Sequence, residues 1–252
     1  MTRIEKFNRF KGLHKSGTPL VLYNIWDAGS AKAVEAAGAK AIATGSWSVA
    51  GAQGYSDGQA MPLDRVLDIV LRIAETTTLP VSIDFEGGYA ESDADLSTNI
   101  AKLLETGVIG LNFEDQVLGG QGLHPSKVQA RRIAVIRDTA QKIGAPVFIN
   151  ARTDVFLKSK PDMHATHLDE AKKRAAQYSK AGADGFFVPG LADPDLIRDI
   201  CESVDLPINI MTSTTTPEIA ALADLGVARV SYGPGPFRDT YAAVTEAAKR
   251  VF

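Results

Sequence analysis

The sequence has a single cysteine, Cys201, among its 252 residues. One thiol excludes an intrachain disulfide and a cysteine-rich metal site, and it is typical of a reducing compartment. Long apolar runs are also missing, because none approaches the ~18 residues of a membrane-spanning helix. The first residues lack the apolar segment of a signal peptide. We therefore expect a cytoplasmic protein without a membrane partner.

Charge of one sign is not in excess either. The 27 lysines and arginines and the 30 aspartates and glutamates give a formal net charge of −3 at pH 7. Because no stretch of the chain is strongly basic, binding of nucleic acid through its phosphates is not expected. With 45% hydrophobic and 23% charged residues, the composition is that of a globular protein. The expected partner is a small molecule.

What the chain does contain is a regular alternation of short apolar runs and longer helical patterns. Continuous apolar runs are typical of parallel strands that are buried on both faces. We expect eight strands, at residues 20–25, 41–45, 81–86, 110–115, 147–153, 185–189, 208–211 and 229–233.

Apolar residues recur at helical spacing between these runs. The clearest helical face follows Pro62 and consists of Leu63, Val66, Leu67, Val70 and Ile73. Five predicted strands are preceded by a glycine where the end of a helix favours positive φ, namely Gly38, Gly107, Gly144, Gly182 and Gly226. These positions predict helix ends followed by short loops.

Strands and helices alternate from end to end without a linker or a shift in composition. Eight units of about 31 residues predict one domain over residues 1–252 with the (β/α)8 TIM barrel fold of the α/β class. A short basic helix over residues 3–16 precedes the first strand and is expected to cap the bottom of the barrel. The alternative is an open, doubly wound sheet with helices on both faces.

Acidic residues end two neighbouring strands of the predicted barrel. Active sites of this fold lie at the carboxyl ends of the strands, where Asp84, Glu86 and Glu114 are found. Like charges this close repel one another unless a cation or protons neutralise them. Oxygen ligands favour Mg2+, with Mn2+ as a substitute, over zinc. The alternative is that these acids pair with nearby lysines or arginines.

Further strand-end residues are candidates for binding an anionic substrate. The Arg152 guanidinium suits a carboxylate or phosphonate, with an ion pair inside the acidic cluster as the alternative. Ser46 and the backbone amides near Trp47 are suited to an enolate oxygen or a carboxylate, and a packing role for Trp47 is equally consistent. Tyr23 and Asn209, from the first and seventh predicted strands, complete the candidate substrate-binding residues.

The segment from Gly119 to Lys127 follows the fourth strand and has three glycines in four positions. This composition is typical of a mobile lid or of an ordinary surface loop. His124 within it is a candidate acid or base, with a solvated histidine as the alternative. His164 and His167 have the spacing of a metal-binding pair but no third ligand nearby, so we expect them at the surface.

Five motifs resemble those of the isocitrate lyase and phosphoenolpyruvate mutase superfamily, and the similarity covers nearly the whole chain. They are residues 24–31 (NIWDAGSA), 54–58 (GYSDG), 84–89 (DFEGGY), 112–115 (NFED) and 226–231 (GVARVS). The resemblance implies an Mg2+-dependent enzyme that makes or breaks a C–C or P–C bond beside a 2-oxo acid or its enolate. It also implies a homodimer or homotetramer whose subunits exchange the eighth helix, here residues 236–251.

The resemblance further implies roles for the acidic residues. Asp84 matches the metal-binding aspartate of the superfamily, while Glu86 and Glu114 match residues that hold metal-bound waters. Asp57 matches an acid on a mobile loop near the reacting carbon. Asp57, Glu114 and Arg152 are therefore the candidate catalytic residues.

The same resemblance implies how the substrate is held. Arg152 matches the residue that binds the distal anionic group of the substrate. Ser46 and Trp47 match the site that binds a carboxylate of the substrate. The resemblance thus implies two anion-binding positions in one site.

Two departures from the superfamily motifs narrow the expected reaction. Isocitrate and methylisocitrate lyases have a cysteine in the lid and the mutase has a Lys-Thr-Asn-Ser lid, whereas residues 119–127 match neither. We expect an Mg2+-dependent lyase that cleaves a C–C bond beside a 2-oxo acid and forms pyruvate, by oxaloacetate decarboxylation or a retro-aldol reaction. The alternatives are a P–C bond enzyme, such as a phosphonopyruvate hydrolase or a phosphomutase, and a non-catalytic 2-oxo-acid-binding protein.

Overall fold

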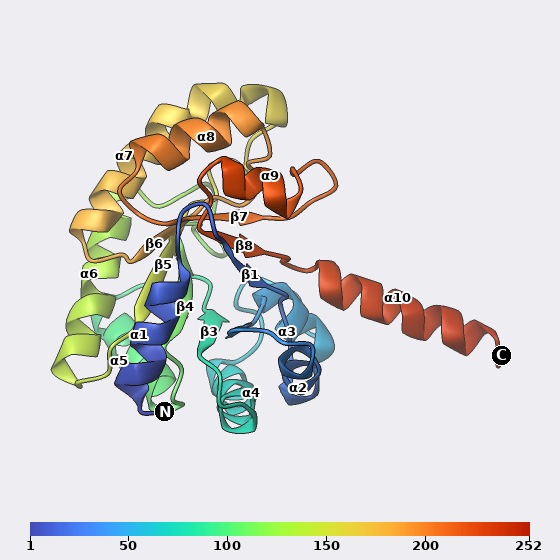
Figure 1. The fold of residues 1–252 in the computed structure, drawn as a ribbon. Helices are drawn as coiled ribbons and strands as arrows, with labels where there is room; N and C mark the ends of the chain where they lie inside the picture. The colour runs from blue at the N-terminus through green and yellow to red at the C-terminus, as the bar shows by residue number, and fades with distance from the viewer.

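Eight parallel strands form a barrel in the computed structural model, which describes residues 1–252 (Figure 1). Each strand pairs with its neighbours in the order β1-β8-β7-β6-β5-β4-β3-β2. A bridge between Ile25 and Thr44 joins the two ends of this series, so the sheet closes on itself. The strands are β1 (Leu20–Leu22), β2 (Ile42–Ala43), β3 (Val81–Asp84), β4 (Gly110–Glu114), β5 (Phe148–Arg152), β6 (Gly185–Phe187), β7 (Ile208–Met211) and β8 (Arg229–Ser231). The predicted barrel is confirmed, and the open sheet is excluded.

Helices lie between the strands and, apart from α1 and α10, surround the barrel (Figure 1). They are α1 (Arg3–Leu13), α2 (Ala28–Ala36), α3 (Ser46–Ala52), α4 (Leu63–Thr76), α5 (Asp93–Glu105), α6 (Ser126–Lys142), the 3-10 helix η1 (Pro161–Met163), α7 (His164–Lys180), α8 (Pro194–Ser203), α9 (Ile219–Asp224) and α10 (Gly235–Lys249). In α4 the predicted face is buried through Val66, Val70 and Ile73. None of the helices combines the length and the apolar character needed to cross a membrane.

The glycines that precede five strands have the predicted backbone conformation. Gly38, Gly107, Gly144, Gly182 and Gly226 all have positive φ, between 66° and 101°. An L-residue with a side chain rarely adopts this conformation, so glycine ends each helix at low cost and the chain turns directly into the next strand. The sequence therefore predicted these helix ends correctly.

Helix α1 caps the amino-terminal end of the barrel, as expected. Phe10 is fully buried and packs edge-on against Phe148 of β5, with ring centroids 5.4 Å apart. His14 stacks on the same Phe148 ring at 4.2 Å. The helix ends at Leu13 instead of residue 16, because the chain turns through Gly17 at φ 75° into β1.

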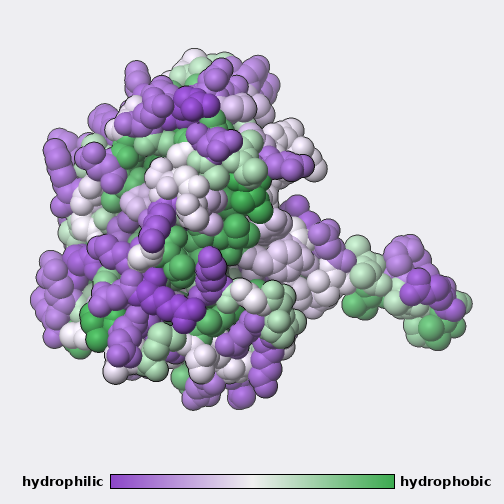
Figure 2. Space-filling view, in the orientation of Figure 1, coloured by the Kyte–Doolittle hydropathy of each residue, from purple (hydrophilic) through white to green (hydrophobic).

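Helix α10 projects away from the barrel, and the C-terminus lies at its outer end (Figure 1). Phe237 anchors its first turn by packing edge-on against Trp26 at 5.1 Å between ring centroids. Beyond this point Tyr241, Val244 and Val251 are exposed, with Val251 80% exposed. Figure 2 shows apolar surface near the tip of this helix. The apolar face of the last helix is therefore uncovered in a single chain.

Two sequence expectations are wrong in detail. The strands predicted at residues 20–25 and 41–45 keep only three and two residues in the ladder, since the polar residues at their ends turn out of it toward the mouth of the barrel. His164 is buried, not at the surface, and its Nε2 lies 3.0 Å from the Phe156 carbonyl oxygen. That contact satisfies the buried ring nitrogen, which explains why a polar side chain is tolerated there.

Candidate active site

A cleft of about 830 Å³ opens at the carboxyl ends of the strands. Its walls come from the loops that follow most of the strands and from the start of α10. The residues of the predicted site that line it are Tyr23, Ser46, Trp47, Asp57, Asp84 and Arg152. The barrel thus brings together side chains from five different regions of the sequence.

Asp84 ends β3 and lies at the floor of this cleft. Its Oδ2 accepts hydrogen bonds from the Ser46 backbone nitrogen at 3.2 Å and from Ser46 Oγ at 3.0 Å. Its Oδ1 is buried and has no partner. One carboxylate oxygen is therefore fixed by the first residue of α3, while the other is buried without a hydrogen-bond partner.

Glu86 follows Asp84 after a single residue but is held by two other groups. The Gln59 backbone nitrogen donates to its Oε2 at 2.7 Å, and the Tyr89 hydroxyl donates to its Oε1 at 2.9 Å. Gln59, Glu86 and Tyr89 are the three non-glycine residues with positive φ, so this contact holds strained backbone in place. Burial raises the pKa of Glu86 to about 7, opposed by the Tyr89 hydrogen bond.

Arg152 lies among carboxylates at the end of β5. Its Nη1 is 2.9 Å from Glu114 Oε2 and 3.9 Å from Asp84 Oδ2. On the other side, Nε and Nη2 donate to the two oxygens of Asp154 at 2.6 and 2.9 Å. The alternative role of an ion pair inside the acidic cluster is the arrangement in this structure. The guanidinium nevertheless lines the cleft and is 15% exposed.

The pKa values of this group follow from burial and from the shared charges. Burial raises the pKa of Glu114 to about 8, and the nearby Arg152 opposes this shift. Burial alone would lower the pKa of Arg152, but Glu114 and Asp154 outweigh it and raise the pKa above its ordinary value. Partial burial, and then the charge of Asp84, raise the pKa of Asp57. The carboxylates around Arg152 therefore outnumber the positive charges near them, and an added cation would stabilise their ionised forms.

The donors present fit Mg2+ better than a metal with a full protein cage. No three histidine, cysteine, aspartate or glutamate side chains are grouped as a ready ligand set. Mg2+ commonly binds through one or two carboxylates and keeps several waters. Asp84, with its unpartnered Oδ1, is the residue present that could supply one such ligand, and Glu86 and Glu114 are neighbouring carboxylates that interact with its charge.

The remaining predicted residues take different positions. Trp47 lines the cleft, packs edge-on against Phe237 at 5.7 Å and lies beneath the Arg238 guanidinium at 4.9 Å from the ring. Tyr23 is half-exposed at the rim, and its ring lies 5.3 Å from that of Tyr232. Trp47 therefore combines the predicted place in the site with the alternative packing role.

Asn209 does not line the cleft. It is fully buried below the floor, where its Oδ1 accepts a hydrogen bond from Ser231 Oγ at 3.1 Å. Ser231 is a lining residue, so Asn209 reaches the cleft through it. Direct contact between Asn209 and a substrate remains a prediction.

The segment from Gly119 to Lys127 contains the tip of a short hairpin beyond β4 and the first two residues of α6. An antiparallel bridge joins Gln116 to Leu123, and the His124 backbone nitrogen donates to the Asp115 carbonyl oxygen at 2.7 Å. The His124 carbonyl accepts from Arg174 Nη1 at 2.9 Å, which ties the end of the hairpin to α7. The His124 side chain is not among those that line the cleft.

Sequence reasoning missed two residues of this site. Asp154 holds the Arg152 guanidinium with both oxygens, and its own backbone nitrogen donates to Asp115 Oδ1 at 3.0 Å. Asn24 is buried at the end of β1, where its Oδ1 accepts from the backbone nitrogens of Tyr232 and Gly233 at 2.9 Å. Both occur next to predicted site residues, and their polar character at a strand end was the available signal.

Comparison with known proteins supports this picture. A sequence profile of the phosphoenolpyruvate phosphomutase family matches residues 10–252. The 2-methylisocitrate lyase of Escherichia coli K12 is 28% identical over 250 residues, covering 96% of this chain and 82% of that protein. An oxaloacetate decarboxylase of Pseudomonas savastanoi pv. phaseolicola is 28% identical over 177 residues, covering 68% of this chain and 58% of that protein.

A solved structure gives the same result at higher similarity. A proposed phosphonomutase from Burkholderia cenocepacia J2315 is 43% identical and superimposes with a TM-score of 0.97 over 100% of both chains. The family match over nearly all of the sequence agrees with the strand-end motifs and the barrel. The chain therefore belongs to the phosphoenolpyruvate phosphomutase family, in the isocitrate lyase and phosphoenolpyruvate mutase superfamily of lyases and mutases.

Proposed function

We propose that the protein is an Mg2+-dependent lyase that cleaves a C–C bond beside a 2-oxo acid and releases pyruvate. Oxaloacetate decarboxylation and a retro-aldol split are the two forms of this reaction. The observation that carries the proposal is the Asp84 carboxylate in the cleft, whose buried Oδ1 has no partner and whose Oδ2 lies 3.9 Å from Arg152 Nη1. This pairing suits a divalent cation and an anionic substrate bound side by side.

Each residue of the site has a task in this reaction. Bound Mg2+ would act as a Lewis acid toward the 2-oxo group, so that the electron pair of the broken C–C bond is accommodated. Arg152 binds the distal carboxylate of the substrate, and Ser46 keeps Asp84 in place through two hydrogen bonds. Asp57 stands on the loop at the rim of the same cleft, where it can exchange a proton with the carbon left by cleavage.

The direct test is metal-dependent pyruvate formation from oxaloacetate. Free divalent cations also promote this decarboxylation, so the Asp84→Asn variant at the same metal concentration is the matched control. We expect turnover by the wild-type protein with Mg2+ or Mn2+, none after chelation, and none above background for the variant. Equal rates for the two proteins with oxaloacetate and with substituted 2-oxo diacids would refute the proposal.

Chemistry at a P–C bond is the second candidate. It is favoured by the similarity to the proposed phosphonomutase, which extends over the full length of both chains. Phosphonopyruvate is the discriminating substrate, followed by ³¹P NMR. Release of inorganic phosphate indicates a hydrolase, and formation of phosphoenolpyruvate indicates a mutase. A third candidate, a 2-oxo-acid-binding protein, predicts calorimetric binding of these acids without any turnover.

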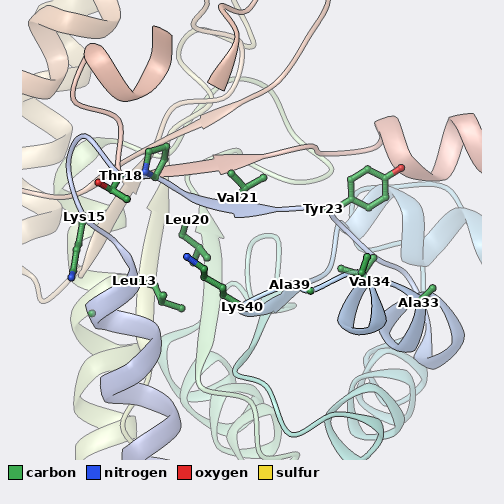
Figure 3. Close-up of a pocket in the computed structure, with 14 residues that line it drawn as sticks. Leu13, Lys15, Thr18, Leu20, Val21, Tyr23, Ala33, Val34, Ala39 and Lys40 are labelled. Carbon is green, nitrogen blue, oxygen red and sulfur yellow. The ribbon is translucent and has the colours of Figure 1, made fainter. Parts of the chain in front are cut away.

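We also propose that subunits assemble by exchanging α10. A second groove, of about 730 Å³, runs along β1 between α1 and α2 (Figure 3). Val21 points into it from the outer face of β1 and is 38% exposed, with Leu13, Val34 and Ala37 around it. Outer faces of barrel strands are normally covered by helices. Figure 2 shows apolar surface in this region of the molecule.

The position of the groove indicates its occupant. Because β1 is the neighbour of β8, the helix after β8 is the one that would cover this face in a closed barrel. In this chain that helix is α10, which instead points away with an uncovered apolar face. We therefore assign the groove to α10 of a second copy, which makes a homodimer the smallest assembly.

A further inference from the structure

A polar layer lies inside the barrel, directly beneath the floor of the cleft. Barrel interiors are normally filled with branched apolar side chains. Here the largest fully buried side chain is Arg229, 1% exposed, which contacts Asn112 and is the register partner of Asn209, while Asn150 also contacts Asn112. Arg229 forms no ion pair within 4 Å, and its Nε and Nη1 have no hydrogen-bond partner. A buried charge of this kind is costly, so a function for it is expected.

The one side chain that Arg229 contacts by a hydrogen bond is Asn112. Arg229 Nη2 lies 3.2 Å from Asn112 Oδ1, and Asn150 Nδ2 lies 2.9 Å from the same oxygen. A guanidinium has donors and no acceptor, so the atom of Asn112 that faces it must be the oxygen. Arg229 therefore determines the orientation of the Asn112 amide, with Oδ1 toward the interior of the barrel.

The other end of the Asn112 amide has no partner in the protein. Asn112 is one of the residues that line the cleft, and it is the register partner of Asp84 on the neighbouring strand. The Asn112 Nδ2 atom is not fully buried. By contrast, the Asn209 Nδ2 atom is fully buried and also lacks a hydrogen-bond partner. A donor at this place is therefore available to whatever occupies the cleft.

We propose that Arg229 and Asn150 hold the Asn112 amide with its Nδ2 toward the cleft, which makes Asn112 a ligand-binding residue for an anionic oxygen and Arg229 its positioning residue. The expected ligand is a carboxylate or enolate oxygen bound above Asp84. The surrounding side chains supply acceptors, so a neutral donor at this position selects for an acceptor on the ligand. This role rests on the proposed function, since both place an anionic 2-oxo acid in one cleft.

The first test is the isosteric variant Asn112→Asp, with oxalate and Mg2+ as the probe. Oxalate carries two carboxylates and does not react, so calorimetry measures its binding without turnover. An aspartate at 112 still accepts from Arg229 and Asn150, and it adds an ion pair to Arg229, so the thermal midpoint should not fall. It offers an oxygen to the cleft in place of the donor, and we expect oxalate affinity to drop by more than about tenfold.

The second test separates positioning from general structural support. Oxalate affinity is measured for Asn112→Ala, Arg229→Gln and the double variant. If Arg229 acts through Asn112, its replacement weakens binding in the wild-type background and has no further effect beside Asn112→Ala. Equal losses in both backgrounds would show that Arg229 supports the barrel as a whole, and would overturn its role as a positioning residue.

The outcomes also distinguish this role from the proposed reaction. Unchanged oxalate affinity in Asn112→Asp would overturn the binding role even if the wild-type protein turns over oxaloacetate. Oxalate binding that depends on Asn112, in a protein that turns over no 2-oxo acid, would support the binding role while refuting the lyase activity. Failure of the wild-type protein to bind oxalate with Mg2+ would overturn the role outright.

Discussion

Glu114 and Arg152 are register partners on β4 and β5, and their side chains meet at the mouth of the barrel with Oε2 and Nη1 2.9 Å apart. This contact joins the predicted metal-binding and anion-binding parts of the site. A substrate carboxylate that binds Arg152 has to share the guanidinium with Glu114 and Asp154. In the proposed reaction, binding of a cation nearby and of a substrate anion at Arg152 would therefore be coupled electrostatically.

Replacing Arg152 tests this coupling. Arg152→Ala leaves Glu114 and Asp154 buried without their cation, so we expect a loss of ~3–5 kcal/mol in the free energy of unfolding. Binding of oxalate should weaken by ~2–5 kcal/mol if the substrate contact is a desolvated charge pair. Chemical denaturation and calorimetry measure the two effects separately. Arg152→Lys keeps the charge but not the fork-shaped geometry, and it should recover stability better than affinity. Unchanged oxalate affinity in Arg152→Ala would contradict the assigned role.

Replacing Asp84 tests the metal site. In Asp84→Asn the amide oxygen still accepts from the Ser46 backbone nitrogen and hydroxyl, so the fold should be kept. The unpartnered side of the carboxylate becomes a neutral amide, and Mg2+-dependent turnover should fall by more than ~100-fold, beyond the loss typical of residues outside the ligand shell. Asp162→Asn, at an exposed acid on η1, is the control and should change nothing. A similar loss in both variants would point to a defect in the preparation, and full activity of Asp84→Asn would exclude the site.

Much of the fold could be predicted from the sequence because its signals are local. Continuous apolar runs mark the strands, and Gly107 or Gly182 mark helix ends whose backbone conformation only glycine adopts readily. Some predicted strands are too long, because residues such as Tyr23 and Asn24 lie outside the ladder of the sheet. Their positions depend on contacts at the cleft and not on the local sequence.

The site was predictable in its residue types but not in its contacts. Asp84 follows from its place at the end of a buried strand. That Arg152 would be held by Asp154 depends on the turn after β5, and the orientation of Asn112 depends on Arg229, 117 positions away. Contacts set by residues so distant in sequence leave no periodic pattern, so reasoning from local pattern does not reach them.

The exchange of α10 has a simple test in solution. Val244 lies on the exposed apolar face of this helix, and Val244→Asp would place a charge in the groove of the partner. We expect the variant to be monomeric by size-exclusion chromatography with light scattering, and Val21→Asp in the groove should have the same effect. Glu246→Lys, on the opposite face of α10, is the control and should leave the assembly intact. A monomeric wild-type protein would contradict the exchange.

His14 gives the stability of the fold a predictable dependence on pH. Burial, and then the charge of Arg229, lower the pKa of His14 from 6.5 to about 3 in the folded protein. The unfolded chain therefore binds a proton below pH 6.5 that the folded chain does not bind, and the free energy of unfolding decreases as the pH falls from 6.5 to 3. Well inside this window the slope from one such group is ~1.4 kcal/mol per pH unit.

The comparison of wild type with His14→Phe isolates this contribution. Burial raises the pKa of Glu86 and Glu114, which gives a slope of opposite sign over part of the same range, but both proteins share it. A phenylalanine keeps the stacking on Phe148 and removes the titrating ring. The free energy of unfolding of the variant should therefore increase relative to that of the wild type as the pH falls from 6.5 to 4. A difference that does not vary with pH would show that His14 takes up a proton in the folded protein as readily as in the unfolded chain.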